Sequence, residues 1–470
     1  MILKNRYFLV IVALLIGSFV GFKLTETFAI KYIMENLPID TATLDEKDVY
    51  VTEIEDGVFA SPKELSYVDN KAKNIILLIA DGMSLSQITA YRMMKGSLNE
   101  RISMDKFPYS GIVLTHSYNA AVTDSASSAT AYSTGFKTNN GALGLDQDLN
   151  ELENLTETID KFGFVSSLIS TSEVTHATPA AFAAHVDLRS KTDIISSQMI
   201  DSRVATILGG GRYFFTPEEQ GGKREDGRNL LDEIKESHIV LTEKNQLSEI
   251  SSSLDKQVLG LFADEHLRDE DKKDNHDLEP SLAEMLQYSI TRSDLLMNQG
   301  CEGFFIMAEG SQVDWAGHVN DFDYLIREME DFDEAVDLAL EIAKERQDTL
   351  VLVTSDHEVG GLLIEPANPI DNSLDDVKFS FNTAVGGGTH TGVPVPVYAY
   401  GPGSENFTGT LDNTDIYYAM LAALDLEMLA PPALSAFGFR LARKDGESLD
   451  AWNARNHALQ EGVNARQRVH

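Results

Sequence analysis

The chain has 470 residues, and 43% of them are hydrophobic, which is enough to bury the core of one large α/β domain. Its 38 Lys and Arg residues against 74 Asp and Glu residues give a net charge of −36 at pH 7. A surface this acidic repels nucleic-acid phosphates, so we expect no nucleic-acid partner. The single cysteine, Cys301, excludes an internal disulfide bond.

The N-terminal residues are typical of an export segment. Lys4 and Arg6 form a short basic region ahead of residues 7–22, which are uncharged and mostly apolar. This stretch is slightly shorter than the ~20 residues of a membrane-spanning helix and long for the core of a signal peptide. We interpret residues 1–30 as a signal peptide or an N-terminal membrane anchor. Either one places the remainder outside the cytoplasm, as a periplasmic, secreted or membrane-anchored protein.

The next residues, 31–73, are polar and acidic and form a lead-in to the main domain. Beyond them, short and continuously apolar runs recur at residues 74–80, 164–170, 304–308, 349–354 and 395–400. Such runs are typical of strands that are covered on both faces. Residues 321–343, between two of these runs, have apolar positions at helical spacing. Strands that alternate with helices predict an α/β fold: a doubly wound, largely parallel central sheet with helices on both faces.

Two polar segments interrupt this pattern. Residues 216–257 are predicted to form surface helices and loops. Residues 264–279 are a dense charge run, which we interpret as a solvated loop. The alternative is that His266 and His276 in this run bind an additional cation.

Acidic residues follow three of the predicted strands, at Asp81, Glu309 and the pair Asp356 and His357. In a doubly wound sheet the ligand site lies beyond the carboxyl ends of the strands, so we expect these side chains to meet at one edge. Chance places one acid after a strand easily, but three together with His and Ser nearby favour a site.

Two further histidines belong to this group. Asp314 and His318 stand at i and i+4, which on a helix places both side chains on one face. His390 lies in the glycine-rich sequence GGGTHTG. Imidazole with carboxylate suits zinc, whereas oxygen ligands alone suit magnesium. The set predicts a site for two or three divalent metal ions.

The sequence VTDSASSATAYSTG, residues 122–135, is dense in small hydroxyl residues. It predicts a helix that begins near Ser125, where free backbone N–H groups and the helix dipole favour an alkoxide and bind phosphate. Taken alone, the pattern also fits a helix start that is merely capped and packed by small side chains. The metal-type residues elsewhere favour Ser125 as a nucleophile.

In this order, the motifs resemble the alkaline phosphatase family. They are DGM at 81–83, TDSASSATAYSTG at 123–135, HATPAAFAAHVDLR at 176–189, AEGSQVDWAGH at 308–318, TSDHE at 354–358 and HTGVPVPVYAYGPG at 390–403. The resemblance implies hydrolysis of small phosphate monoesters through a phosphoserine, at a site with two zinc ions and one magnesium ion, and a homodimer. It makes residues 74–430 the catalytic domain and residues 431–470 a C-terminal extension.

The resemblance also implies a role for each matching position. The ligands of the first zinc are Asp314, His318 and His390. The ligands of the second zinc are Asp81, Asp356 and His357, with Ser125 poised on that ion. Asp81 also reaches magnesium, which is bound by Thr178 and Glu309 as well. Arg189 matches the family's phosphate-binding arginine, and Asp124 precedes the nucleophile.

Three positions depart from the enteric bacterial pattern. His176 and Trp315 stand where the enteric enzyme has Asp and Lys, and this pair resembles cold-adapted marine bacterial enzymes. The surroundings of the magnesium should therefore differ from the enteric case. Val359 stands where some members have a His behind the first zinc, so the carboxylate of the first zinc lacks the orienting contact that this His provides.

Two alternative functions remain at this point. One is a related metal-dependent phosphodiesterase or sulfatase, although these relatives tend to use Thr or a modified Cys as the nucleophile. Ser125, Asp124 and Arg189 together favour phosphate monoesters. The other is a catalytically inactive, membrane-tethered phosphate-binding protein. All the implied ligand positions carry metal-binding residues, which favours an enzyme.

Overall fold

The computed structural model describes residues 49–53, 71–96, 99, 101–248, 253–268, 279–367, 376–383 and 388–426. The predicted export segment, residues 1–30, and the predicted C-terminal extension, residues 431–470, lie outside the described residues. Among the described helices, none combines the length and apolar character needed to cross a membrane. Every element below belongs to residues 48–470.

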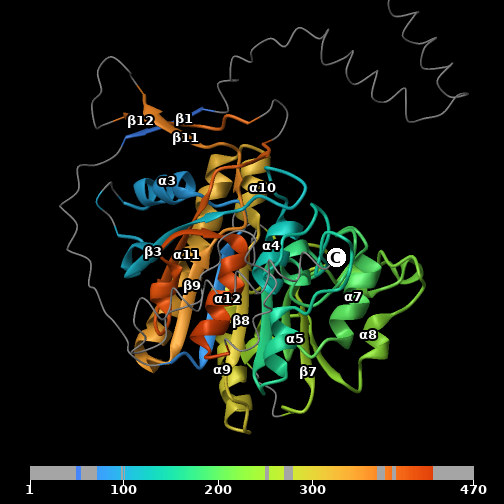
Figure 1. Ribbon diagram of the computed structural model, residues 1–470. Coiled ribbons are helices and arrows are strands. Elements are labelled where there is room, and N and C mark those ends of the chain that lie inside the picture. Colours follow the sequence, from blue (N-terminus) through green and yellow to red (C-terminus); the bar gives the residue numbers. More distant parts are fainter. Residues whose placement is uncertain are drawn as a thin grey trace, which may run out of the picture. The chain divides into compact units, whose positions relative to one another are not determined.

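In the described part of the chain, the largest sheet has ten strands in the order β15-β3-β14-β9-β2-β8-β4-β5-β7-β6 (Figure 1). Its left half in this order consists of β15 (Gly409–Asp412), β3 (Tyr109–Leu114), β14 (Val395–Tyr400), β9 (Thr349–Thr354) and β2 (Asn74–Ala80). The other half consists of β8 (Phe304–Gly310), β4 (Val165–Glu173), β5 (Thr206–Gly210), β7 (Gln257–Leu261) and β6 (His238–Leu241). Only β14 runs antiparallel to its two neighbours in this sheet. The prediction of a largely parallel central sheet is confirmed.

Helices cover both faces of this sheet because side chains alternate between the faces along each strand. On β2, Ile75, Leu77 and Ile79 belong to one buried cluster. Its helices are α4 (Ser125–Thr134), α5 (Leu155–Asp160), α6 (Ala177–Ala180), α7 (Thr192–Asp201) and α12 (Asn413–Ala423). Ile76 and Leu78 belong to the opposite cluster. The helices there are α3 (Leu85–Lys95), α9 (Leu282–Met297), α10 (Gln312–His318) and α11 (Phe322–Arg346).

The strongest sequence patterns correspond closely to these elements. The runs at 74–80, 349–354 and 395–400 coincide with β2, β9 and β14. The helical spacing at 321–343 corresponds to α11, where the Asp321 side chain caps the first turn by accepting a hydrogen bond from the Tyr324 N–H at 2.9 Å. The helix ends at Gln347, whose φ of 58° is left-handed.

The prediction for residues 216–257 is wrong in part. Besides short helices such as α8 (Leu230–Glu233), the segment contains β6 and the first residue of β7. β6 is only four residues long, pairs with β7 alone and buries only its two end residues, His238 and Leu241. A short edge strand of this kind has no continuous apolar run, so its sequence resembles a polar loop.

Two small sheets lie outside the central one. β1 (Val49–Glu53), from the predicted lead-in, pairs with β12 (Asp376–Ser380), which also pairs with β11 (Leu363–Pro366). β10 (Glu358–Val359) pairs with β13 (His390–Thr391) and joins two distant parts of the chain. β10 begins two residues after Asp356, and β13 carries His390, so this pair lies at the carboxyl edge of the central sheet.

Candidate metal centre

Ser125 is the first residue of α4, where the sequence predicts a helix start. The Asp124 side chain caps the helix by accepting a hydrogen bond from the Ser127 N–H at 3.0 Å. All ten residues of α4 are buried, and most are small, so the helix packs tightly at the sheet edge. The Ser125 side chain nevertheless faces other polar groups: its Oγ lies 3.4 Å from Asp81 Oδ2 and 3.2 Å from His357 Nε2.

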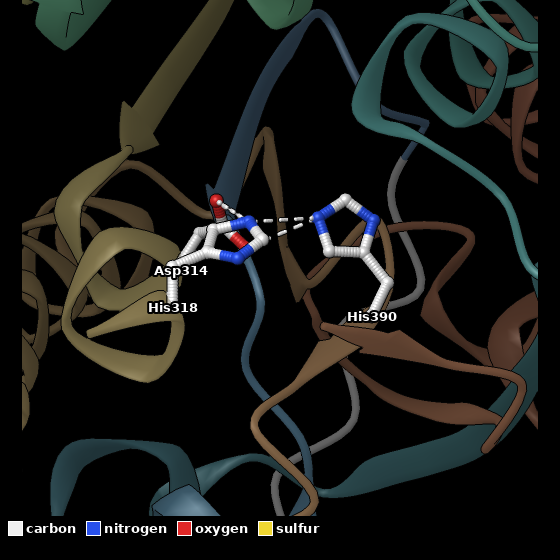
Figure 2. A group of neighbouring side chains, drawn as sticks. All are labelled: Asp314, His318 and His390. Carbon is white, nitrogen blue, oxygen red and sulfur yellow. Dashed lines mark hydrogen bonds and ion pairs between the residues drawn. The ribbon is translucent and has the colours of Figure 1, made fainter. Parts of the chain in front are cut away.

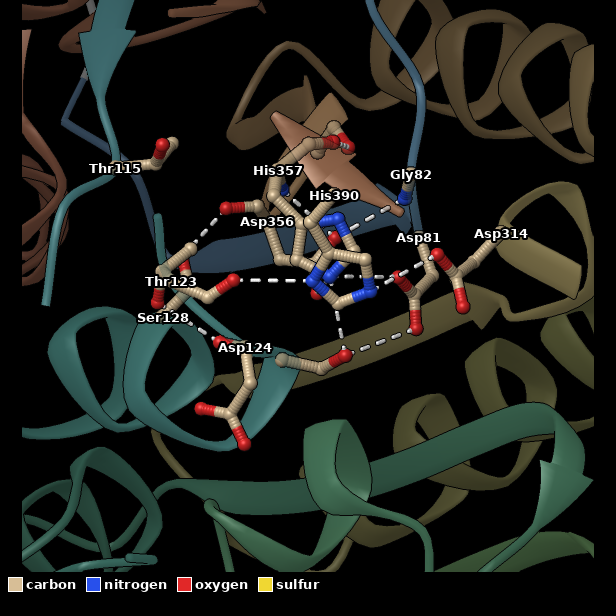
Figure 3. A network of polar contacts seen from close by, with 12 residues as sticks. Asp81, Gly82, Thr115, Thr123, Asp124, Ser128, Asp314, Asp356, His357 and His390 are labelled. Atoms are coloured by element: carbon tan, nitrogen blue, oxygen red, sulfur yellow. Dashed lines mark hydrogen bonds and ion pairs between the residues drawn. The ribbon is translucent and has the colours of Figure 1, made fainter. Parts of the chain in front are cut away.

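Asp81, Asp356 and His357 form one cluster beside this serine, which we call the buried triad (Figure 3). All three side chains are fully buried, and they follow the ends of β2 and β9. His357 Nε2 lies 3.4 Å from Asp81 Oδ1 and 3.2 Å from Asp356 Oδ2. Asp356 Oδ1 accepts hydrogen bonds from the N–H groups of Gly82 and His357. The other oxygen of Asp356 and Oδ1 of Asp81 accept no hydrogen bond from described residues, so both point into the cluster.

Burial sets the protonation of the buried triad. It raises the pKa of Asp81 well above its usual value, and repulsion from Asp356 and Asp314 adds to the shift. Burial likewise raises the pKa of Asp356 to about 6 and lowers the pKa of His357 to about 4. Crowded carboxylates and a neutral imidazole are the donor set that a divalent cation stabilises, because its charge offsets their mutual repulsion.

Asp314, His318 and His390 form a second cluster, the open triad (Figure 2). The predicted i, i+4 relation holds on α10, with His318 Nε2 3.2 Å from Asp314 Oδ2. His390 Nε2 lies 3.5 Å from Asp314 Oδ1 and 3.1 Å from His318 Nε2. The His318 side chain is 38% exposed, whereas Asp314 is buried. The two triads touch, because the rings of His357 and His390 stack with centroids 3.5 Å apart.

Two main-chain carbonyls orient these histidines. His318 Nδ1 lies 2.7 Å from the Gly388 oxygen, and His390 Nδ1 lies 3.0 Å from the Thr123 oxygen. A carbonyl only accepts, so each Nδ1 carries the proton and each Nε2 presents its lone pair to the cluster. Two imidazole lone pairs that face each other repel unless a proton or a metal ion lies between them, and the Asp314 carboxylate raises the pKa of His318, which shows that it favours positive charge there. The open triad therefore fits a zinc ion by its own geometry.

A third cluster joins Asp81, His176 and Glu309, whose candidate ligand atoms lie within 4.8 Å of one another. Burial raises the pKa of Glu309 to about 8, although a hydrogen bond from Ser311 opposes the shift. Ser311 Oγ donates to Glu309 Oε2 at 2.7 Å. The structure thus places Asp81 and Glu309, two of the predicted magnesium ligands, next to His176, which the sequence predicts in the surroundings of the magnesium. Burial lowers the pKa of His176 to about 4, so its imidazole is neutral at pH 7.

Arg189 lies beside the nucleophile. Its Nη2 donates to His176 Nε2 at 2.9 Å, and its Nη1 is 3.5 Å from Asp124 Oδ2. Two oriented partners hold the guanidinium as a fixed, partly exposed cation, which suits recognition of a tetrahedral anion. Asp124 therefore caps the Ser125 helix and also holds Arg189, a double role that its position before the serine did not reveal.

Trp315 lies between two imidazoles. Its ring packs edge-on against His176, with ring centroids 5.9 Å apart. It also packs at a tilt against His266, with ring centroids 4.1 Å apart. His266 also pairs with Glu173. His266 is exposed in the loop after β7, in agreement with the interpretation of this charge run as a solvated loop, and it also packs against Trp315. His276, the other histidine of that charge run, lies outside the described residues.

Val359 fills the position where a histidine was expected in some relatives. It is fully buried between two glycines, Gly82 and Gly317. A Cβ atom on Gly82 would lie 2.6 Å from Val359 Cγ1, and one on Gly317 would lie 2.3 Å from it. The Val359 N–H also donates a hydrogen bond to the Gly82 oxygen at 3.3 Å. Val359 thus helps to fix the spacing between the strand end that carries Asp81 and the helix that carries Asp314, through side-chain packing and through this hydrogen bond.

Sequence reasoning missed the groups that orient the ligands. The carbonyls of Thr123 and Gly388 hold the two histidines of the open triad, and main-chain groups leave no residue signature. Ser311 and Ser172 surround the Glu309 carboxylate and hydrogen-bond to each other at 3.0 Å. Ser311 was visible in the motif AEGSQVDWAGH, two residues after Glu309, and this spacing was the available signal.

Comparison with known proteins identifies relatives over most of the chain. Residues 72–370 and 363–426 match the family model described as alkaline phosphatase. Alkaline phosphatase 4 of Bacillus subtilis is 34% identical over 418 residues, covering 73% of this chain and 87% of the relative. The alkaline phosphatase of Escherichia coli is 32% identical over 420 residues, covering 77% and 88% of the two chains.

Solved structures give the same result. The alkaline phosphatase of the Antarctic bacterium TAB5 is 35% identical, with a TM-score of 0.67, and covers 76% of this chain and 99% of its own. A TAB5 variant with Mg bound in its M3 site is 33% identical, with a TM-score of 0.66 over the same shares of the two chains. The cold-active enzyme of the psychrophile Shewanella sp. is 29% identical, with a TM-score of 0.63, and covers 75% and 99%. The predicted resemblance to the family and to its cold-adapted bacterial members is confirmed.

Proposed function

The chain belongs to the alkaline phosphatase family, and from this premise we propose that it hydrolyses phosphate monoesters through a phosphoserine on Ser125, at a site for two zinc ions and one magnesium ion. Hydrolysis of phosphate monoesters follows from the family. The finer mechanism rests on one observation above all. Ser125 begins a buried helix with its Oγ 3.2 Å from His357 and 3.4 Å from Asp81, in the cluster where two sets of metal-type donors touch.

Each cluster fits one ion by its donor set. In this proposal the open triad holds the first zinc and the buried triad the second, with Ser125 beside the second. Asp81, Thr178 and Glu309 hold magnesium, and His176 stands next to them. Bound divalent ions would supply the positive charge that phosphoryl transfer requires on the entering, leaving and non-bridging oxygens.

The chain's own residues position the reacting groups. Ser125 Oγ forms the new bond to phosphorus while the bond from phosphorus to the alcohol oxygen breaks, and water then cleaves the phosphoserine to release inorganic phosphate. The N-terminal end of α4 favours negative charge at Ser125. Arg189 binds two non-bridging oxygens through its forked N–H groups, held in place by Asp124 and His176.

Positive charge within the site can bind an anionic substrate despite the acidic surface of the protein. A net charge of −36 repels a phosphate monoester at long range, so binding depends on groups within the site. Arg189 is one such group, and the two triads with Glu309 are where further positive charge would be bound. His176 accepts a hydrogen bond from Arg189 and packs against Trp315, so these two side chains border the anion-binding group.

We further propose that the enzyme acts outside the cytoplasm. Lys4 and Arg6 precede an apolar stretch in the manner of an export segment, whether it is cleaved or retained as an anchor. The family resemblance also suggests a homodimer.

The test is a comparison of three substrates. Wild-type protein should hydrolyse an aryl phosphate monoester much faster than the matching diester or sulfate ester, and chelation of metals should abolish the activity. Ser125→Ala should lower monoester turnover by roughly four orders of magnitude or more, because it removes the nucleophile. Unchanged turnover in Ser125→Ala would sink the mechanism, and a preference for the diester or sulfate would favour the rival hydrolases.

A further inference from the structure

His390 lies on a very short strand outside the central sheet, which gives a metal ligand little support from regular structure. Its strand, β13, has two residues and, among the described strands, pairs only with β10, which is equally short. Neither strand belongs to the central sheet. By contrast, the other two members of the open triad, Asp314 and His318, lie one turn apart on α10. Besides the contact of His390 Nδ1 with the Thr123 carbonyl, the geometry of the open triad therefore depends on what holds β13 against β10.

One buried carboxylate, Glu358, makes that connection. It lies opposite Thr391 in the β10–β13 pair, and its Oε2 accepts a hydrogen bond from the Thr391 hydroxyl. Its Oε1 accepts from Gln87 Nε2 at 3.2 Å and from the Leu362 N–H at 3.3 Å. Glu358 is 3% exposed, so these bonds form away from bulk water, where a lost partner costs more than at the surface.

Gln87 connects this carboxylate to the other side of the metal centre. It is fully buried in α3, and its side-chain oxygen accepts from the Ser84 N–H at 3.0 Å. Its amide group also donates to the Val359 carbonyl at 3.0 Å. α3 begins four residues after Asp81, and β10 directly follows His357. Glu358 therefore joins the segments that follow two buried-triad ligands to the strand that carries His390.

We propose that Glu358 is a positioning residue for the open triad: through Thr391 it holds His390 against Asp314 and His318, so that the three side chains bind zinc as one preformed site. The Val359 side chain cannot orient a metal ligand by hydrogen bonding, whereas the neighbouring Glu358 carboxylate holds the strand that carries His390 through its bond to Thr391. This inference rests on the proposed assignment of zinc to the open triad.

The hydrogen bond between Thr391 and Glu358 can be removed without changing any proposed metal ligand. Thr391→Val keeps the shape of the side chain and deletes the hydroxyl, whereas Thr391→Ser keeps the hydroxyl. Glu358→Gln keeps the shape but presents an amide group to donors. Thr408→Val and Glu365→Gln are matched controls. The Thr408 hydroxyl donates to the Glu405 carbonyl at an exposed position, and Glu365 lies on β11, paired with Lys378.

The measured quantity is the zinc affinity of the full chain, obtained by competition with a chromogenic chelator. His390→Asn removes one ligand of the open triad, so the zinc whose binding this variant weakens is assigned to that triad. Thr391→Val and Glu358→Gln should weaken that zinc by about ten- to hundredfold and leave the other zinc unchanged. Thr391→Ser and both controls should match wild type. Monoester turnover in Thr391→Val should recover at saturating zinc, which a general folding defect would not permit.

The outcomes separate this inference from the proposed function. If wild-type protein binds no zinc that depends on His390, the assignment of the open triad fails. If wild-type protein binds that zinc and Thr391→Val binds it equally tightly, the assignment stands and the role of Glu358 is overturned. If Glu358→Gln does not fold, Thr391→Val and Thr391→Ser decide the question by themselves.

Discussion

The buried triad and the open triad use similar side chains but are held by different parts of the fold. Asp81, Asp356 and His357 follow the ends of two adjacent parallel strands, β2 and β9, and all three are fully buried. The open triad combines a seven-residue helix, α10, with a two-residue strand, and His318 is half-exposed. The sheet itself fixes the side where Ser125 lies, whereas short connections fix the side nearer solvent.

This difference suits the two halves of the proposed reaction. The nucleophile needs a fixed geometry, because a small displacement of an attacking atom costs much of the rate. The leaving alcohol and the incoming water must exchange with solvent, which a partly exposed cluster permits. A rigid inner site and an adjustable outer site therefore predict different responses to substitution.

The largest difference should appear when one histidine is removed from each triad. His357→Ala should reduce monoester turnover roughly a thousandfold, since several kcal/mol of charge stabilisation beside Ser125 are lost. Added zinc should not restore it, because the buried position has no substitute donor. His318→Ala should lose about ten- to hundredfold at limiting zinc and recover in part at high zinc, where solvent replaces the imidazole. Zinc titrations of steady-state turnover measure both, and equal rescue of the two variants would remove the distinction.

The second prediction concerns the packing that separates the triads. Gly82 has a φ of 79°, and an added Cβ would lie 2.6 Å from Val359 and 2.8 Å from the Asp314 Cα. Gly82→Ala should cost about 1–2 kcal/mol for the left-handed backbone and a further 1–3 kcal/mol for overpacking. It should also weaken zinc binding at both triads. Gly221→Ala is the matched control, because Gly221 has a φ of 85° and nothing within 4 Å of an added Cβ.

Denaturant unfolding and zinc content provide the comparison. Equal destabilisation by Gly82→Ala and Gly221→Ala, with zinc binding intact in both, would show that the contact with Val359 and Asp314 does not set the spacing of the triads.

The third and smallest prediction concerns pH. In metal-free protein, burial raises the pKa of Asp356 to about 6 and of Glu309 to about 8, both above the values of the unfolded chain. Burial lowers the pKa values of His176, His357 and His390 to about 4, and these histidines favour the folded state as pH rises towards 6.5. Above about pH 6.5 the folded state binds more protons, through Glu309, so stability is lost as pH rises to 8. The loss in this window should be about 2 kcal/mol. Protein loaded with zinc and magnesium should lack this decline, because the ions replace the protons. Melting curves across this range, with and without metals, test it.

The sequence predicted the parts of the fold that carry strong local patterns. The strands β2 and β9 are continuously apolar because both their faces are covered, and Asp81 and Asp356 follow them within two residues. The edge strand β6 was missed because only its ends are buried, which leaves no periodic signal. The i, i+4 pair of Asp314 and His318 was predictable because a helix alone sets that spacing.

The missing parts of the site are long-range or made by the main chain. The bond from Gln87 to Glu358 joins residues 271 positions apart, and neither residue type is distinctive by itself. The carbonyls that orient His318 and His390 belong to Gly388 and Thr123, whose side chains play no part in those bonds. Contacts of this kind follow from how the strands and helices meet, and a pattern along one segment does not reveal them.

The most direct test of the central claim is to trap the intermediate. Metal-loaded wild-type protein is mixed with an excess of phosphate monoester, quenched in acid within one turnover, digested and examined by mass spectrometry. The account predicts a phosphate on the peptide that contains Ser125, absent from Ser125→Ala and from chelator-treated protein. Rapid monoester hydrolysis with no phosphate on Ser125 under any quench condition, or with phosphate on another residue, would contradict it.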